Sequence, residues 1–314
     1  MHFDLALKIV TTRSNSRFKL IKGNTVQKIP ITVIIPVKNE EDNLPRCLER
    51  LGRFERVIVV DSGSEDKTVA VAEKNGAEIV NFRWNGLYPK KRNWVLINHA
   101  ITTPWVFFLD ADEVVDDVLC DEVKARTASD EYVGFWLKYR NYFMGRELKF
   151  GVAQKKLALF RVGAGLYERI EEDRWSSLDM EVHEHPILAG RVGVIETLID
   201  HRDFRGIDRF IGRHQAYAKW EANRYMLLRS GATQTILTKR QSVKYRFLSS
   251  RWYAFAYFFY SYILKGGILD GWPGFSYAFY KTWYFHTIRN LILEYEEEKK
   301  KNVDIGNNYR STQS

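Results

Sequence analysis

The sequence predicts an α/β fold in which a mostly parallel sheet is flanked by helices. Runs of Val, Ile and Phe such as ITVIIPV (31–37) and RVIVVD (56–61) have the length and composition of buried strands. Helical segments of about a dozen residues separate these runs, an alternation typical of parallel sheets covered on both faces. A chain of 314 residues with 45% hydrophobic residues can bury an ordinary core.

The elements of the first half follow from local signals. After the strand at 31–37, EEDNLPRCLERL has the apolar spacing of a helix. After the strand at 56–61, SEDKTVAVAEKNG predicts a helix that Ser64 caps and Gly76 ends. A third strand (AEIVNF), another helix (PKKRNWVLINHA) and a fourth strand (WVFFLD) follow. Ligands of parallel sheets bind beyond the carboxyl ends of the strands, so a cleft is expected there.

The second half has a different character. After about residue 130, shorter aromatic strands such as YVGFWLKYRNYF, KLALFRV and RVGVIETLID indicate an antiparallel addition. We therefore predict an arm at 1–30, a catalytic domain at 31–203, a basic and aromatic helical region at 204–295, and a disordered tail at 296–314. Within the domain, 31–120 is expected to form the cleft at the strand ends and 121–203 to shape its acceptor side.

Charge and cysteine content narrow the class of protein. Between His201 and Arg251 there are twelve Lys or Arg against three acids, an excess that equals the net charge of +9 for the whole chain. Such a zone suits anionic lipid, phosphorylated substrates or nucleic acid. The two cysteines, Cys47 and Cys120, have no metal-knuckle spacing and suit a reducing compartment. The apolar N-terminal stretch is too short for a secretory signal, so a cytoplasmic location is expected.

The strongest candidate site is VFFLDADEVVD, where a strand ends in Asp110, Asp112, Glu113 and Asp116. Residues i and i+2 of an extended segment point the same way, so Asp110 and Asp112 can share a divalent cation that relieves their repulsion. The alternative is a row of solvated acids before a helix N-terminus, where negative charge is favoured.

Four further stretches carry polar side chains at strand ends or helix starts. IPVKNEEDN exposes groups that could hold a base or ribose, and VVDSGSEDKT offers carboxylates to a base or a hydroxyl; either could equally be a helix start. In YPKKRNW three cations stand at the start of a helix, where the helix dipole disfavours positive charge. Binding of a pyrophosphate would explain their presence. The alternative is a solvated basic patch. LDMEVHEH could supply a general base or a metal-binding histidine. Alternatively, its acids lie on the surface and its histidine forms ordinary hydrogen bonds within the protein. The glycine-rich nucleotide motifs are absent.

Together and in this order, ITVIIPVKNEEDNLPRCLE, VIVVDSGSEDKTVAVAEKNGAEIV, KKRN and VFFLDADE resemble the inverting family 2 glycosyltransferases with the GT-A, Rossmann-like fold. The match covers roughly residues 31 to 120. GVAQKKLALFRV, EVHEH and the aromatic tail are similar to the bacterial subgroup that contains lipopolysaccharide core glucosyltransferases. The Gln-x-x-Arg-Trp motif of processive synthases is missing, because Gln215 is followed by AYAKW, so one sugar per encounter is expected.

The resemblance implies roles for named residues. It places the nucleotide's base and ribose at Pro36, Lys38, Glu40, Asp61 and Asp66. It places the diphosphate at Lys91 and Arg92, the ribose or sugar at Asp110 and Ala111, and Mn²⁺ or Mg²⁺ at Asp112, with His183 as the candidate histidine ligand. Glu184 is the expected general base and Glu181 the reserve. The donor it implies is a nucleotide-sugar, in this family commonly a UDP-sugar.

The aromatic stretch WYAFAYFFYSYIL (252–264) is shorter than the roughly 20 residues that span a bilayer. Trp and Tyr favour the headgroup boundary, and the preceding basic zone suits anionic lipid. We therefore expect a peripheral enzyme on the inner face of the membrane, acting on a saccharide or lipid-linked acceptor. Buried helices or a homo-oligomer contact are the alternatives for this stretch.

Other functions remain open at this point. The transferase could use a polyprenyl phosphate acceptor, which is already an anion and needs no base. A catalytically silent membrane module and a nucleic-acid-binding protein are the rivals from other classes. Nucleic acid is disfavoured, because the carboxylates of Asp110 and Asp112 would repel phosphate unless a metal were bound.

Overall fold

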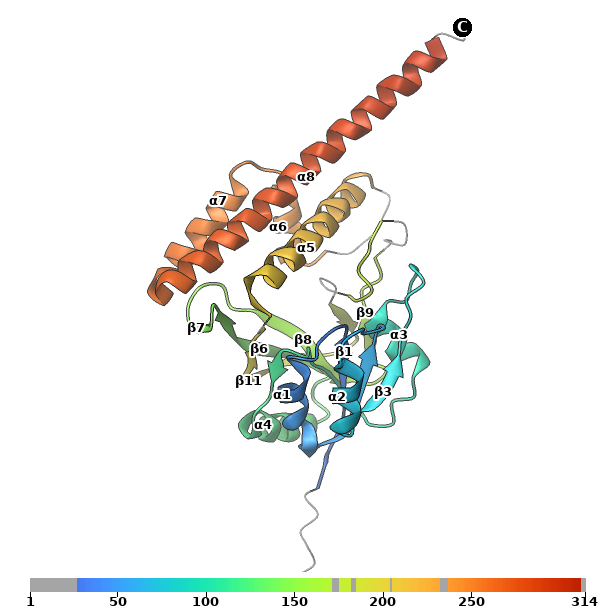
Figure 1. Ribbon diagram of the computed structural model, residues 1–314, viewed down its shortest axis with the longest axis vertical. Helices are drawn as coiled ribbons and strands as arrows, with labels where there is room; N and C mark the ends of the chain where they lie inside the picture. Colours follow the sequence, from blue (N-terminus) through green and yellow to red (C-terminus); the bar gives the residue numbers. More distant parts are fainter. Residues whose placement is uncertain (1–26, 171–174, 182–184, 204, 232–236, 312–314) are drawn as a thin grey trace, which may run out of the picture.

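A nine-stranded mixed sheet forms the centre of the protein (Figure 1). The computed structural model describes residues 27–170, 175–181, 185–203, 205–231 and 237–311, without the side chains of residues 240 and 302–311. Most of the predicted N-terminal arm therefore lies outside the described residues. The strand order is β3-β2-β1-β4-β8-β6-β11-β5, and β7 pairs with β6.

The first half of the sheet is wholly parallel, as the sequence predicts. It consists of β1 (Ile29–Val37), β2 (Phe54–Asp61), β3 (Glu78–Asn81) and β4 (Trp105–Phe108). Every residue of β4 is buried, and so are all but one of β1, because the continuous apolar runs pack on both faces of the sheet. The parallel half of the predicted fold is confirmed.

The second half adds antiparallel strands to the parallel half, as the sequence predicts, so the complete sheet is mixed. It contains β5 (Glu113–Val114), β6 (Gly134–Phe143), β7 (Arg146–Leu148), β8 (Lys155–Arg161) and β11 (Val192–His201). β8 runs antiparallel to both β4 and β6, while β11 is parallel to β6 and antiparallel to β5. Antiparallel neighbours need no long crossover, and only the short β7 intervenes between β6 and β8. A separate two-stranded sheet joins β9 (Gly165–Tyr167) and β10 (Pro186–Leu188).

Short helices connect the strands. They are α1 (Leu44–Glu49), the 3₁₀ turn η1 (Leu51–Arg53), α2 (Thr68–Lys74), α3 (Lys91–Asn98) and α4 (Asp117–Thr127). Ser64 does not cap α2, which begins at Thr68. Instead the Ser64 hydroxyl donates to Asp61, and the carboxylate of Asp66 accepts from the amide of Thr68 at 2.9 Å. Polar side chains thus hold an open loop before the helix.

The parallel register brings the candidate residues to one edge. Val37 is paired with Asp61, and Ile34 with Phe108. The residues that follow β1 and β4, including Lys38 and Asp110, therefore emerge side by side at the carboxyl ends of adjacent strands. This is the edge where parallel sheets bind ligands.

The C-terminal helices form a second layer with its own core. They are α5 (Gly206–Arg229), α6 (Lys239–Phe247), α7 (Tyr253–Phe258), the π-turn η2 (Phe259–Leu264), the 3₁₀ turn η3 (Gly267–Asp270) and α8 (Gly271–Ser311). The core residues they share are Ala218, Ala222, Tyr225, Tyr245, Leu248, Tyr284, Ile288 and Ile292. Figure 1 shows α8 running alongside α5 and extending far beyond the sheet.

The helix α8 continues where the sequence predicts a disordered tail. EYEEEKKK places glutamates four residues before lysines, a spacing that supports a helix. Across the described ranges, no helix combines the length and the apolar character that crossing a bilayer requires.

Candidate active site

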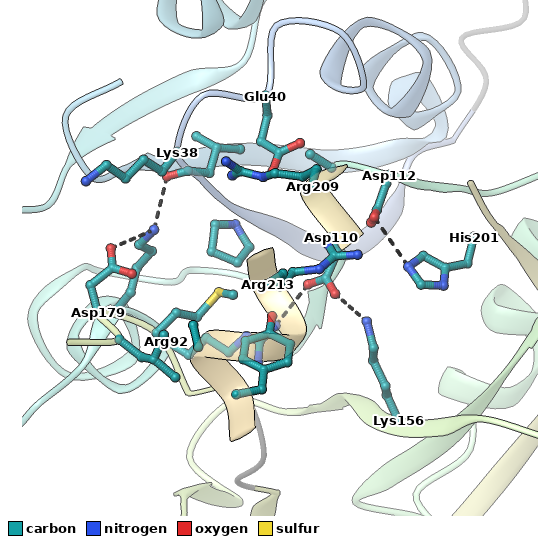
Figure 2. A pocket seen from close by; sticks show the side chains of 18 of the residues that line it. Lys38, Glu40, Arg92, Asp110, Asp112, Lys156, Asp179, His201, Arg209 and Arg213 are labelled. Carbon is teal, nitrogen blue, oxygen red and sulfur yellow. Dashed lines mark hydrogen bonds and ion pairs between the residues drawn. The ribbon is translucent and has the colours of Figure 1, made fainter. Parts of the chain in front are cut away.

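A cavity of about 1000 Å³ opens at the carboxyl ends of β1 and β4 (Figure 2). Its floor contains Pro36, Lys38 and Glu40 after β1, and Asp110, Ala111 and Asp112 after β4. Helices α5 and α8 supply the facing wall. The structure thus brings most of the predicted donor and metal residues into one hollow.

A lysine gathers the acids at the end of β4. The ammonium of Lys156, on β8, contacts the carboxylates of both Asp110 and Glu113. Arg92 also donates to Asp110, with Nη2 and Oδ1 2.9 Å apart. Two cations of the protein therefore reduce the repulsion between the carboxylates at the end of β4. Lys156 was not among the site residues predicted from the sequence. A lysine at the start of the apolar strand KLALFRV could have indicated one.

These contacts set the protonation of the cluster. Burial raises the pKa of Asp110, but the charges of Lys156 and Arg92 outweigh this and hold the pKa below its usual range. Glu113 is fully buried, and burial raises its pKa to about 7 despite Lys156. Glu113 also accepts the amide of Asp110 at 3.1 Å. The charges of Asp110 and Glu113 are thus balanced within the protein, and their contacts hold the end of β4 in place.

Asp112 faces a histidine that the sequence did not single out. Its Oδ2 lies 3.3 Å from Nε2 of His201, the last residue of β11. The other ring nitrogen of His201 lies 3.0 Å from Oδ1 of Asn141 on β6. Burial lowers the pKa of His201, but the carboxylate of Asp112 raises it more. The sequence predicted strand β11. It could not predict that β11 pairs with β5 and so brings His201 to Asp112, because the spacing of residues along the chain does not determine such a contact.

The predicted diphosphate residues lie at the start of α3. Lys91 donates from Nζ to the carbonyl of Val37 at 3.0 Å and pairs with Asp179 at 3.2 Å. Burial lowers the pKa of Lys91, although Asp179 opposes this shift. Both Lys91 and Arg92 line the cavity.

Glu181 caps α3. One carboxylate oxygen accepts the amide of Arg92 at 2.9 Å and the other accepts the amide of Asn93 at 3.0 Å. Burial raises the pKa of Glu181, and the residue is absent from the cavity wall. An acid at this helix N-terminus offsets the unfavourable placing of three cations there.

The remaining predicted residues fall into two groups. Asp61 and Asp66 are absent from the cavity wall, and their carboxylates accept backbone amides of their own loop, Gly63 at 2.8 Å and Thr68 at 2.9 Å. The predicted metal ligand His183 and base Glu184 lie outside the described residues. Their neighbours Met180 and His185 line the cavity.

Comparisons with known proteins connect this site to a family. Residues 32–177 match the family model described as "Glycosyl transferase family 2". The lipopolysaccharide core biosynthesis glycosyltransferase LpsC of Rhizobium meliloti is 31% identical over 184 residues, covering 55% of this chain and 62% of LpsC. A glycosyltransferase of Rickettsia conorii is 36% identical over 112 residues, covering 34% of this chain and 39% of its own. The match thus spans less than two thirds of either relative.

Two solved structures also match this chain over part of its length. TarS (1–349) of Staphylococcus aureus has a TM-score of 0.38 and 16% identity, covering 85% of this chain and 91% of its own. Glucosyl-3-phosphoglycerate synthase of Mycobacterium tuberculosis, in complex with phosphoglyceric acid, has a TM-score of 0.39 and 18% identity, covering 60% of this chain and 78% of its own.

Proposed function

We propose that this chain moves one sugar from a nucleotide-sugar to a saccharide or lipid-linked acceptor, on the basis of the match of residues 32–177 to the family model described as "Glycosyl transferase family 2". The observation that carries the proposal is the pair Asp112 and His201, beside Asp110, in the cavity at the ends of β1 and β4. Similarity to LpsC supports an acceptor of the lipopolysaccharide core or a related envelope polysaccharide. We propose UDP as the donor nucleotide, a GT-A fold and inversion at the anomeric carbon.

The residues present fit a divalent cation. A carboxylate and an imidazole nitrogen 3.3 Å apart could both turn to one ion, and Mg²⁺ and Mn²⁺ commonly combine few protein ligands with substrate phosphates. Within the described ranges no group of three or more His, Cys, Asp or Glu could hold a metal ion, so the donor's diphosphate would supply further oxygens. The imidazole favours the softer Mn²⁺ over Mg²⁺. Bound there, the ion would neutralise charge developing on the leaving diphosphate.

Protein groups complete the donor site in this proposal. Lys91 and Arg92 lie at the cavity wall and would stabilise the departing diphosphate through charge-assisted hydrogen bonds. Lys38 and Glu40 would hold the ribose or base. Asp110, fixed by Arg92 and Lys156, would orient the sugar. The loop of Asp61 and Asp66 would support this wall from behind.

The proposal is tested by screening nucleotide-sugars for metal-dependent hydrolysis and thermal stabilisation of the chain. We expect one nucleotide-sugar to raise Tm only when Mn²⁺ or Mg²⁺ is present, and its slow hydrolysis to release the nucleoside diphosphate. If no nucleotide-sugar stabilises the chain in either metal, the proposed activity is rejected.

Replacing Glu184 and Glu181 separately should distinguish a general base from a helix cap. We expect Glu184→Gln to lower turnover by about 10²- to 10⁴-fold, because the acceptor hydroxyl loses its base. We expect Glu181→Gln to lower the free energy of unfolding by about 1–2 kcal/mol, because an amide can satisfy only one of the two amides of α3. Turnover below Tm should change little.

Turnover assays and urea denaturation measure the two effects. Full turnover in Glu184→Gln would favour the alternative acceptor, a polyprenyl phosphate, which needs no base. Loss of turnover without loss of stability in Glu181→Gln would instead make Glu181 the base.

We also propose that the C-terminal helices rest on the inner face of the cell membrane. Large apolar side chains are exposed on α7, η2, η3 and the start of α8: Phe255, Phe259, Ile263, Leu264, Leu269 and Trp272. From residue 237 to 272 the sequence has six Lys or Arg and one acid, Asp270. Asp270 is engaged by the amides of Lys149 and Phe150 at 3.0 Å each. Exposed aromatic side chains amid positive charge are complementary to anionic lipid.

Substituting two exposed side chains should release the protein from lipid. Trp252 and Leu264 are 63% and 65% exposed, and we expect Trp252→Ser with Leu264→Ser to weaken binding to phosphatidylglycerol vesicles at least tenfold, because two apolar groups no longer insert. Co-sedimentation measures the binding. Ile97→Ser with Val118→Ser, which are 51% and 65% exposed on the sheet domain, is the matched control.

Equal vesicle binding by the double variant and the wild type would contradict this placement. If neither binds vesicles and the double variant halves the mass in solution, the surface is a contact between two copies of the chain.

A further inference from the structure

The wall opposite the β-strand ends is cationic. Arg209 and Arg213 on α5 and Lys281 on α8 line the same cavity as Asp110 and Asp112; these three residues are called the α5–α8 cations below. Figure 2 shows Arg209 and Arg213 beside the acidic strand end. The catalytic role proposed above for Lys91 and Arg92 leaves the α5–α8 cations without an assigned function.

Lys281 is held in place without neutralisation. Among the described residues no carboxylate pairs with its ammonium group, and its nitrogen lies 3.3 Å from Nε2 of His214. His214 Nδ1 lies 2.9 Å from the carbonyl of Phe210, so Nδ1 carries the proton and Nε2 can accept from Lys281. The ammonium has three protons, so two are left for a ligand. The rings of Tyr277 and Tyr284 lie 5.9 Å and 5.4 Å from it.

The charge of the whole cavity is unbalanced. Its wall contains eight Lys or Arg against five Asp or Glu. Two further carboxylates, Glu113 and Asp203, pair with the wall cations Lys156, Arg205 and Arg213, which leaves an excess of one positive charge. A nucleotide-sugar brings two negative charges, and a divalent ion returns two positive ones, so the loaded donor leaves the excess unchanged. A cleft that stays positive after the donor binds attracts a second anion.

We propose that the α5–α8 cations bind an anionic group on the acceptor, a phosphate or carboxylate, while the donor occupies the strand ends. This inference rests on the proposed transferase function, and it defines the class of acceptor. The acceptor oxygen would form the bond to the anomeric carbon, the bond from that carbon to the diphosphate would break, and a hydroxyl proton would pass to the base. The anion would fix the acceptor's orientation and would not react itself.

The protonation of Lys281 makes the site sensitive to pH. Burial, followed by the nearby charge of Arg213, lowers the pKa of Lys281 to about 8. A bound anion stabilises the charged form, so the anion's affinity should be constant below pH 8 and fall above it. The groups around Lys281 are Arg213, His214 and Glu221 from α5 and Tyr277 and Tyr284 from α8.

Calorimetry with sulfate, whose charge does not change over this range, tests the proposal. The full chain is saturated with Mn²⁺ and UDP, and sulfate is then titrated at several pH values. We expect sulfate to bind with the nucleotide still in place, and Lys281→Met to weaken that binding at least tenfold. Arg213→Gln, a second variant on another helix, should weaken it as well. Lys219→Met, an exposed cation on α5 outside the cavity, is the matched control and should bind like the wild type.

Two results would overturn the proposal. One is competition between sulfate and UDP, which would assign the α5–α8 cations to the donor. The other is unchanged sulfate affinity in both Lys281→Met and Arg213→Gln while each remains folded. If Mn²⁺ and UDP do not bind at all, the proposed function fails, and the same variants titrated with sulfate alone still decide whether this wall is an anion site.

Two acceptor probes distinguish the source of the anion. A sugar phosphate should accept a sugar on a hydroxyl and keep its phosphomonoester. A short prenyl phosphate would accept the sugar on phosphate oxygen and become a phosphodiester. Phosphorus NMR of the products separates the two, and only the first agrees with an anion that orients without reacting.

Discussion

Asp112→Asn is expected to lower kcat/KM for the donor by about 1,000-fold or more, because an amide cannot replace a carboxylate that neutralises a cation. The same variant should lose its binding of Mn²⁺, measured by electron paramagnetic resonance independently of turnover. His201→Gln should raise the Mn²⁺ concentration for half-maximal activity at least tenfold, because the imidazole lies 3.3 Å from Asp112.

Asp117→Asn provides the matched control. Asp117 directly follows the acidic run 110–116, but its carboxylate is exposed and pairs with Arg53. Its loss should leave metal binding and kcat/KM unchanged. Wild-type Mn²⁺ binding in both Asp112→Asn and His201→Gln would remove the proposed metal site.

Lys156→Met should destabilise the protein by about 2–3 kcal/mol, because it leaves the fully buried carboxylate of Glu113 without its cation. This loss of unfolding free energy is smaller than for a completely buried ion pair, because the Lys156 side chain is 35% exposed. Adding Glu113→Gln should recover part of the loss, since the buried charge is then removed. Urea denaturation of the single and double variants measures the coupling.

Lys155→Met is the control for Lys156→Met. Lys155 is the exposed neighbour on β8, so its replacement should change the free energy of unfolding by less than about 0.5 kcal/mol. If Lys156→Met is as stable as Lys155→Met, Lys156 does not neutralise the cluster.

Local patterns in the sequence predicted the parallel half of the fold. The runs at 31–37, 56–61 and 105–110 identified their strands because burial on both faces demands continuous apolar residues. The same patterns placed Asp110, Asp112, Lys91 and Arg92 at the edge where the cavity lies. The helix boundary at Ser64 was missed because an internal hydrogen-bond network competes with capping.

Contacts between distant segments could not be predicted in this way. Lys156 meets Asp110 because β8 lies next to β4, and His201 meets Asp112 because β11 pairs with β5. The role of Glu181 as a cap depends on a segment 89 residues from Arg92. In each case a residue's partner is set by sheet order, which one sequence does not determine.

The position of Lys281 on α8 limits the length of any bilayer-anchored acceptor. Trp272 is exposed on the proposed lipid-facing surface, and Lys281 lines the cavity nine residues later on the same helix. At a rise of 1.5 Å per residue the two positions are about 14 Å apart along the axis. This separation is the most by which the two residues can differ in their distance from the lipid, so a lipid-linked acceptor would have to present its accepting hydroxyl within a few sugars of the bilayer.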